Sequence, residues 1–198
     1  MKDPQPDFRP EPGVPMDLQP GLRRILAPNP SPMTFRGTNT YLLGTRDIAV
    51  IDPGPMEPAH LQAILAALGP GQRITHVLVS HAHIDHSPLA GPLASRCGAP
   101  VLAFGRAEDG RSPLMQQLAD QGLMGGGEGV DSAFEPDHRL ADGEEIRGSD
   151  WQLTALHTPG HMANHLGFAW GDVLFSADLV MGWATSLVSP PDGDLGAF

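Results

Sequence analysis

Apolar and polar residues follow strand-like and helix-like patterns in the first third of the chain. Segments 38–43 and 48–52 are rich in aliphatic and β-branched residues, and Gly44-Thr45-Arg46-Asp47 between them has the composition of a turn. These segments predict a β-hairpin. Within 61–68, four aliphatic residues recur at the spacing of one helical face, which predicts a helix that ends at Gly69-Pro70-Gly71.

A second strand-then-helix pattern follows. The segment 74–80 is short and mostly apolar, which predicts a buried strand. Ser87-Pro88 has the composition of a helix N-terminus, so we expect a helix over about 87–96 that is capped by Ser87. Pro92 lies inside it and predicts a kink or an early stop. Another strand is expected at 101–103.

The second half of the chain begins without a sustained period. Residues 105–136, with Gly125-Gly126-Gly127 near the middle, predict a long loop, and long loops in compact domains are often functional. Strand-like patterns then return at 152–157, 166–170 and 173–176. The expected order of elements is therefore a mixture of strands and helices that belongs to the α/β class.

Composition bounds the number of domains and the compartment. The chain has 198 residues, enough for one domain or slightly more. Residues 1–20 contain six prolines, so we expect an extended surface arm there, followed by a domain over 21–198. No segment approaches the ~20 apolar residues that cross a bilayer, and the first residues lack the apolar stretch of a signal peptide. The cytoplasm is therefore the expected compartment, with no membrane partner.

The net charge of the chain indicates which kinds of binding partner are favoured. The formal net charge of -11 disfavours a nucleic acid, because phosphate affinity comes mostly from Lys and Arg. Two divalent cations in a cleft would add positive charge that this count omits, so a nucleic-acid partner stays open, as does a homodimer. Cys97 is the single cysteine and is expected to be a small apolar residue, since no second thiol can pair with it.

A cluster of potential metal ligands follows the strand at 74–80. His81-Ala82-His83-Ile84-Asp85-His86 places four ligands within six residues, and imidazole with carboxylate suits zinc, with iron or manganese as alternatives. In an extended segment, side chains two residues apart point the same way, so His81 and His83 can hold one metal while Asp85 and His86 turn toward a second. Packing these groups together without a cation would be costly.

Three histidines stand apart in the sequence from the cluster at 81–86. For the isolated His60, His76 and His138, an ordinary structural role is the stronger interpretation. Ser80, Ser87 and Ser176 lie near potential ligands, but none sits in a nucleophile-elbow pattern, so we expect them to cap or pack.

Three motifs, in order along the chain, resemble the signature of the metallo-β-lactamase superfamily. They are H-x-H-x-D-H at 81–86, a T-P-G-H turn at 158–161, and an aspartate after the next hairpin, Asp178. Asp178 is similar to the bridging carboxylate of glyoxalase II and RNase Z relatives, whereas many true lactamases have a cysteine in the second site. Segments 85–89 and 182–194 most resemble a subgroup of β-lactamase-like hydrolases that carry a winged-helix tail.

The resemblance implies a dinuclear centre. The implied ligands are His81, His83 and His161 for the first metal, Asp85 and His86 for the second, and Asp178 as the bridge. Metals that share a water lower its pKa from 15.7 to about 7, so a bridging hydroxide would be the nucleophile and Asp85 the catalytic residue that orients it. His157 and His165 flank the third histidine and are candidates for an outer position, in hydrogen-bond contact with a ligand or substrate.

The resemblance also implies an αββα sandwich with its ligands on loops at one shared edge. We expect 38–52, 74–80 and 100–103 in one of two mixed sheets, and 151–178 largely in the other. Relatives supply a further histidine to the second metal from a strand far beyond the bridging aspartate, yet no histidine follows His165. We therefore expect a truncated chain in which the second half of the fold is incomplete.

Three classes of function remain open. The first is a hydrolase of a small thioester, ester or lactone, which the acidic chain and Asp178 favour. The second is a metal-dependent nuclease of the RNase Z type. The third is a non-catalytic metal-binding remnant, which the missing histidine suggests.

Overall fold

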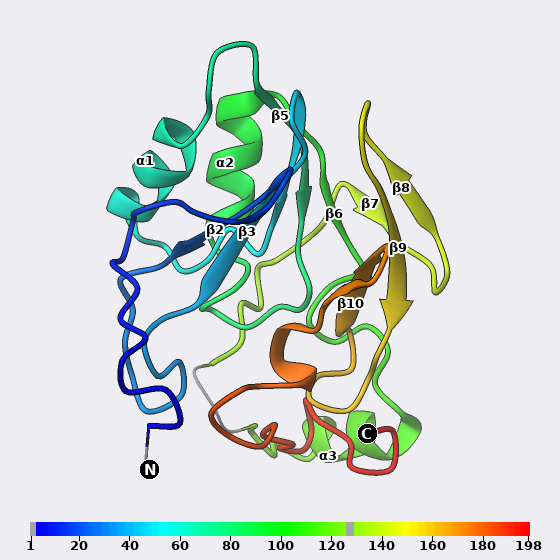
Figure 1. Cartoon of the computed structure of the whole chain (residues 1–198). Coiled ribbons are helices and arrows are strands. Elements are labelled where there is room, and N and C mark those ends of the chain that lie inside the picture. Colours follow the sequence, from blue (N-terminus) through cyan, green and yellow to red (C-terminus); the bar gives the residue numbers. More distant parts are fainter. Residues whose placement is uncertain (1–2, 126–128) are drawn as a thin grey trace.

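A computed structural model describes residues 3–125 and 129–198, in which two β-sheets face one another (Figure 1). The first sheet has seven strands in the order β1 to β7, antiparallel from β1 to β4 and parallel from β4 to β7. They are β1 (Met16–Gln19), β2 (Leu22–Leu26), β3 (Asn39–Leu43), β4 (Asp47–Ile51), β5 (Arg73–Leu78), β6 (Val101–Ala103) and β7 (His138–Arg139).

The second sheet has four strands in the order β11, β10, β9, β8, and all of its described pairings are antiparallel. These are β8 (Glu145–Arg147), β9 (Gln152–His157), β10 (Leu166–Trp170) and β11 (Val173–Phe175). The expected division of the chain between two sheets is confirmed, although the expectation that both sheets are mixed holds only for the first.

Two helices cover the face of the first sheet that points away from the second sheet (Figure 1). They are α1 (Pro58–Ala66) and α2 (Ala90–Cys97). Strand side chains alternate between the two faces, so Leu42 belongs to the core under these helices while Leu43 belongs to the core between the sheets. This alternation produces two apolar cores, one on each face of the first sheet.

The start of α2 corrects one prediction. Leu89, not Ser87, is the residue that precedes the helix, and its side chain makes no capping hydrogen bond. Ser87 is buried and donates instead to Asp131 Oδ2 at 2.9 Å. Pro92 lies in the first helical turn, where the backbone N–H groups have no partner within the helix, so it does not interrupt the hydrogen bonding.

Two segments expected to lack regular structure contain elements. The connection 105–136 includes a third helix, α3 (Pro113–Asp120), whose preceding residue Ser112 accepts a hydrogen bond from the Met115 N–H. Gly126 and Gly127 of the expected glycine loop lie outside the described residues. The last part of the proline-rich segment 1–20 is β1, which forms an exposed edge strand beside β2. Among the described residues, no helix is both long and apolar enough to cross a membrane.

Candidate metal centre

Ligands from both sheets meet at one edge of the sandwich. His81 and His83 follow the end of β5, His161 follows β9, and Asp178 lies in a short 3-10 helix (Ala177–Leu179) after β11. One ligand atom from each of these four side chains lies within 4.8 Å of the others. The predicted proximity of His81 and His161 is confirmed, since their ring centroids are 5.0 Å apart.

Three imidazole nitrogens converge in the geometry of a single metal site. His83 Nδ1 lies 2.9 Å from His81 Nε2 and 3.0 Å from His161 Nε2. Zinc binds nitrogen at about 2.0–2.1 Å, so two nitrogens of a tetrahedral site lie about 3.3 Å apart. One nitrogen of His83 carries at most one proton and cannot form a full hydrogen bond with both neighbours, whereas one cation satisfies all three.

Hydrogen bonds on the far side of two of these rings direct a lone pair into the cluster. His161 Nδ1 lies 2.6 Å from the Leu187 carbonyl, which can only accept, so Nδ1 carries the proton and Nε2 the lone pair. Ser80 donates its hydroxyl proton to Asp52 at 2.8 Å and therefore accepts from His81 Nδ1 at 2.9 Å. Such outer partners commonly fix the orientation of metal-binding histidines.

A second group of ligands lies next to the first. His86 Nε2 is 3.2 Å from Asp85 Oδ2 and 3.4 Å from Asp178 Oδ1. The other oxygen of Asp178, Oδ2, is 3.5 Å from His161 Nε2. Asp178 thus presents one carboxylate oxygen to each group, which is the arrangement that a bridging ligand requires.

Asp52 is a site residue that the sequence analysis treated only as the end of a strand. Its carboxylate accepts from the Ser80 N–H at 2.7 Å, from the Ser80 hydroxyl and from His86 Nδ1 at 3.0 Å. It is buried, and its backbone φ of 50° lies in the left-handed region. The available signal was its position, because the ends of the parallel strands β4 and β5 share one edge of the sheet.

Burial keeps two of the imidazoles neutral. It lowers the pKa of His83 to about 4 and that of His81 well below 6.5, and neighbouring histidines reinforce both shifts. A neutral imidazole offers the lone pair that a metal requires.

His86 and Asp178 carry opposite charges. Burial alone would lower the pKa of His86, but Asp85, Asp52 and Asp178 raise it well above 6.5. Burial alone would raise the pKa of Asp178, but His86 holds it below the usual value. One positive charge therefore sits among three carboxylates, and a metal ion would take over that charge and release the His86 proton.

His157 and His165 lie outside the four-residue cluster. His165 is fully buried, its ring centroid is 5.0 Å from that of His81, and its Nδ1 lies 2.8 Å from Thr158 Oγ1. His157 donates through Nε2 to the Ala163 carbonyl at 2.9 Å and stacks on Phe104. Among the described residues, the ring nitrogens of both histidines bond to the segment around His161 and not to a candidate ligand side chain.

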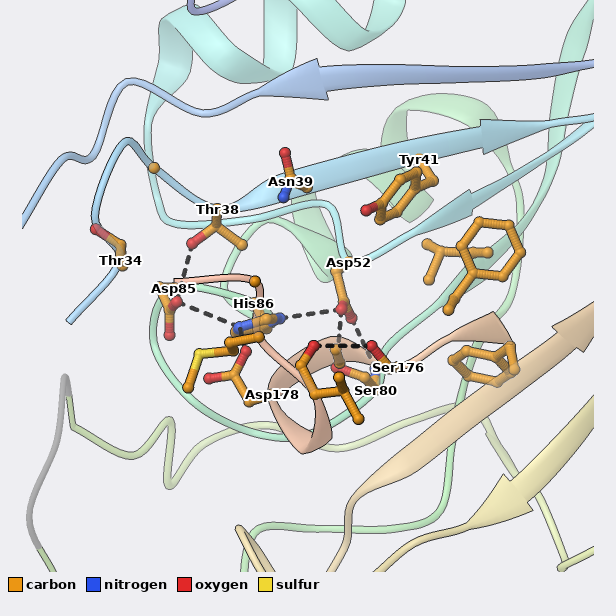
Figure 2. A pocket seen from close by; sticks show the side chains of 18 of the residues that line it. Thr34, Thr38, Asn39, Tyr41, Asp52, Ser80, Asp85, His86, Ser176 and Asp178 are labelled. Carbon is orange, nitrogen blue, oxygen red and sulfur yellow. Dashed lines mark hydrogen bonds and ion pairs between the residues drawn. The ribbon is translucent and has the colours of Figure 1, made fainter. Parts of the chain in front are cut away.

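A cavity of about 260 Å³ opens beside the second group of ligands (Figure 2). Asp85, His86 and Asp178 line one end, and aromatic side chains that include Tyr41 and Phe175 line another part of the wall. Thr38 donates to Asp85 Oδ2 at 2.9 Å and so fixes one oxygen of that carboxylate. The cavity thus places aromatic side chains close to the carboxylates and the imidazole of this group, a combination that small-molecule sites commonly have.

Comparisons with known proteins agree with this geometry. A family model described as the metallo-beta-lactamase superfamily matches residues 33–197. The Beta-lactamase-like protein 2 homolog of Drosophila melanogaster is 32% identical over 174 residues, which cover 83% of this chain and 54% of that protein. An atrochrysone carboxyl ACP thioesterase of Pseudocercospora fijiensis is 30% identical over 185 residues, 91% of this chain and 47% of the relative. The chain spans about half the length of these curated relatives.

Solved structures show the same fold. A beta-lactamase domain protein from Burkholderia ambifaria superimposes with a TM-score of 0.69 at 23% identity, over 92% of this chain and 59% of the other. The protein TTHA1623, solved in a di-iron-bound form, gives a TM-score of 0.59 at 26% identity, over 85% of this chain and 79% of the other. The two-sheet architecture therefore occurs in proteins of known structure, one of which was solved with two irons bound.

Proposed function

The chain belongs to the metallo-β-lactamase superfamily, and from this premise we propose that it is a metal-dependent hydrolase of a small thioester, ester or lactone. The observation that carries the proposal is the convergence of three histidine nitrogens and one carboxylate oxygen within 4.8 Å, beside a cavity. Asp178 strengthens it, because its two oxygens face two groups of ligands.

The donor set favours two divalent metals. Three nitrogens and one oxygen at the first site suit zinc. The di-iron-bound form of TTHA1623 makes iron the main alternative. In this assignment His81, His83 and His161 would hold the first metal, Asp85 and His86 would hold the second, and Asp178 would contribute a carboxylate oxygen to each. Divalent ions at such a centre supply a water of lowered pKa as nucleophile and a Lewis acid for the substrate oxygen.

The surrounding residues position these groups. Asp52 accepts from His86 directly and from His81 through Ser80, so one carboxylate orients a histidine of each group. Thr38 and His86 both contact Oδ2 of Asp85, which leaves Oδ1 to accept a proton or hydrogen bond from the attacking water. Asp85 is accordingly our candidate for the residue that orients the nucleophile.

Three observations favour an acyl substrate over a phosphodiester. One relative of 30% identity is named a thioesterase. The net charge of -11 disfavours a polyanionic partner, and aromatic side chains form part of the cavity wall.

The test compares metal-loaded parent protein with Asp178→Ala on N-acetylcysteamine thioesters, esters, lactones and bis(p-nitrophenyl) phosphate. We expect the parent to hydrolyse an acyl substrate and Asp178→Ala to lose at least about a hundredfold in kcat/KM, because losing even an outer partner of a ligand costs about 10- to 100-fold. Elemental analysis should show fewer metals per chain in the variant. Asp172→Ala, which removes an exposed carboxylate from the turn before β11, is the matched control.

Each alternative has its own outcome. Phosphodiester hydrolysis without acyl hydrolysis would favour the nuclease, and metal binding without either would favour a non-catalytic role. Parental turnover by metal-replete Asp178→Ala would rule out a bridged centre and leave a one-metal mechanism at His81, His83 and His161.

A further inference from the structure

A second cavity, of about 160 Å³, adjoins the one beside the metal ligands. The two cavities share part of their wall, namely Thr34, Gly37, Asn39, Gly182 and Trp183. The second cavity is also lined by Phe8 and by two cationic side chains, Arg24 and Arg36. A molecule bound at the ligand cluster could therefore extend past the shared wall toward these arginines.

The two arginines differ in their partners. Arg36 is neutralised, because it contacts Asp3 Oδ2 at 2.7 Å and donates to the Gln5 carbonyl at 2.7 Å. Arg24 pairs with no carboxylate among residues 3–125 and 129–198. Its Nη2 contacts Met16 Sδ at 3.5 Å, its guanidinium lies 5.0 Å from the Phe8 ring centroid, and its Nε is buried without a hydrogen-bond partner among the described residues.

A guanidinium in this position is a candidate for anion binding. Partial burial without an anion is unfavourable for a cation, and it lowers the pKa of Arg24 from its usual value. A carboxylate or phosphate would restore the lost solvation through paired hydrogen bonds, which Arg forms in fixed geometry. The Phe8 ring already holds the guanidinium on one face, so the side chain is preorganised for such a ligand.

Strand geometry gives the separation from the metal ligands. Arg24 of β2 lies directly opposite Tyr41 of β3, and Thr38 is three residues before Tyr41. At about 3.3 Å per residue, the backbone positions of Arg24 and Thr38 are offset by about 10 Å along the strand direction. Thr38 contacts Asp85, so a ligand that joins the two places needs an extended chain of about that length.

We propose that Arg24 binds the distal anionic group of an acyl chain whose thioester or ester lies at the ligand cluster, so that the preferred substrates are acidic acyl compounds. This inference rests on the proposed hydrolase function. It adds a specificity residue on strand β2, which carries none of the candidate metal ligands.

The test uses two N-acetylcysteamine thioesters of equal chain length, the monothioester of suberic acid and the thioester of octanoic acid. The measured quantity is the ratio of their kcat/KM values with the full, metal-loaded chain. We expect the parent to prefer the suberyl compound and Arg24→Gln to reduce that ratio by about 10- to 100-fold, mainly through KM. Arg24→Lys should retain part of the preference. Arg147→Gln, which removes an exposed arginine from β8, should leave the ratio unchanged.

A binding measurement separates failure of this inference from failure of the hydrolase proposal. Calorimetric titration compares suberamic acid with octanamide, neither of which is a thioester, on the parent and on Arg24→Gln. Tighter binding of suberamic acid to the parent alone supports the anion site even where neither thioester is hydrolysed. Two results would overturn the assignment of Arg24 and leave the hydrolase proposal standing. One is equal affinity of suberamic acid for the parent and for Arg24→Gln, and the other is a ratio of the two kcat/KM values that Arg24→Gln does not change.

Discussion

At the scale of single residues, His60 links protonation to folding. Thr40 donates its hydroxyl proton to the Asp52 carbonyl at 2.6 Å, so it accepts from His60 Nε2 at 2.8 Å. His60 Nδ1 is then a buried lone pair without a partner among the described residues. Burial lowers the pKa of this histidine to about 4. The neutral ring is thus part of the packed structure that supports Asp52.

This shift predicts acid sensitivity of the metal-free chain. The unfolded state takes up a proton on His60 below about pH 6.5 and the folded state only below about pH 4, so the free energy of unfolding falls as the pH falls through this window. The His60 contribution is on the order of 3 kcal/mol. Urea unfolding of parent and His60→Gln between pH 7.5 and pH 4.5 should show a shallower pH dependence in the variant.

Ile64→Val is the matched control for this experiment. Ile64 is buried in the same helix and does not titrate, so the variant should lose about 1 kcal/mol at every pH and remain parallel to the parent. His83 and His165 also have lowered pKa values and contribute equally to parent and variant. A His60→Gln curve parallel to that of the parent would contradict a neutral His60.

Site residues could be recognised from the sequence where several potential ligands lie within a few positions of one another or within a known motif. H-x-H-x-D-H marks a metal site by itself, and the T-P-G-H turn and Asp178 follow it in order. Asp52, Thr38 and the Leu187 carbonyl could not be found in this way. Each acts on a residue at least 26 positions away, and its role depends on which strand ends and loops meet.

At the scale of elements, the segment 187–194 holds the His161 loop in place. The Leu187 carbonyl accepts from His161, and the Asp194 N–H donates to the Gly160 carbonyl at 2.8 Å. This segment is fixed in turn by the start of α3, where Arg111 contacts Asp192 at 2.6 Å with both side chains at most 15% exposed. The helix that the sequence analysis missed therefore supports the metal centre indirectly.

We predict that Arg111→Gln weakens both stability and metal binding. Breaking a mostly buried ion pair leaves the Asp192 carboxylate uncompensated and should cost about 3 kcal/mol. Displacement of the Leu187 carbonyl from His161 should weaken zinc affinity by about 10- to 100-fold, as loss of an outer partner does. Arg106→Gln, which removes an exposed ion pair from the same connection, should resemble the parent.

The two effects of Arg111→Gln are separable by measuring zinc affinity well below the melting temperature. A variant that is less stable yet binds zinc with parental affinity would show that Arg111 supports the fold but not His161. Competition with a chromophoric chelator gives the affinity, and thermal unfolding gives the stability.

Helices and strands were predicted correctly where the apolar pattern was long or where turn and cap residues nearby in the sequence marked their ends. The hairpin of β3 and β4, α1, and the three strands from β9 to β11 were confirmed. Strand β1 lay in a proline-rich segment and exists because it pairs with β2, and β7 has two residues. Such short strands depend on their neighbours rather than on their own composition. For α3, Ser112-Pro113 was an available signal of a helix start.

At the scale of the whole molecule, the two sheets are joined at both ends. At the end of β4 away from the ligands, Trp151 donates to the Asp47 carbonyl at 2.6 Å, and Asp150 accepts from the Thr45 N–H at 2.7 Å. At the other end, His81 and His83 come from the first sheet, while His161 and Asp178 come from the second. A metal ion held by these four residues would cross-link the sheets.

This cross-link predicts that zinc stabilises the whole fold. The unfolded chain does not bring the four ligands together, so free zinc at about 1,000 times its dissociation constant should add about 4 kcal/mol to the free energy of unfolding. For a chain of this size that corresponds to a rise of about 8–16 °C in Tm. Differential scanning calorimetry of the chelated and zinc-loaded chain measures the rise. His161→Ala removes the second sheet's histidine from the cluster and should lose most of it, whereas Asp172→Ala should retain it. A full rise in His161→Ala would mean that zinc binds within the 81–86 segment alone, and the metal would then not join the two sheets.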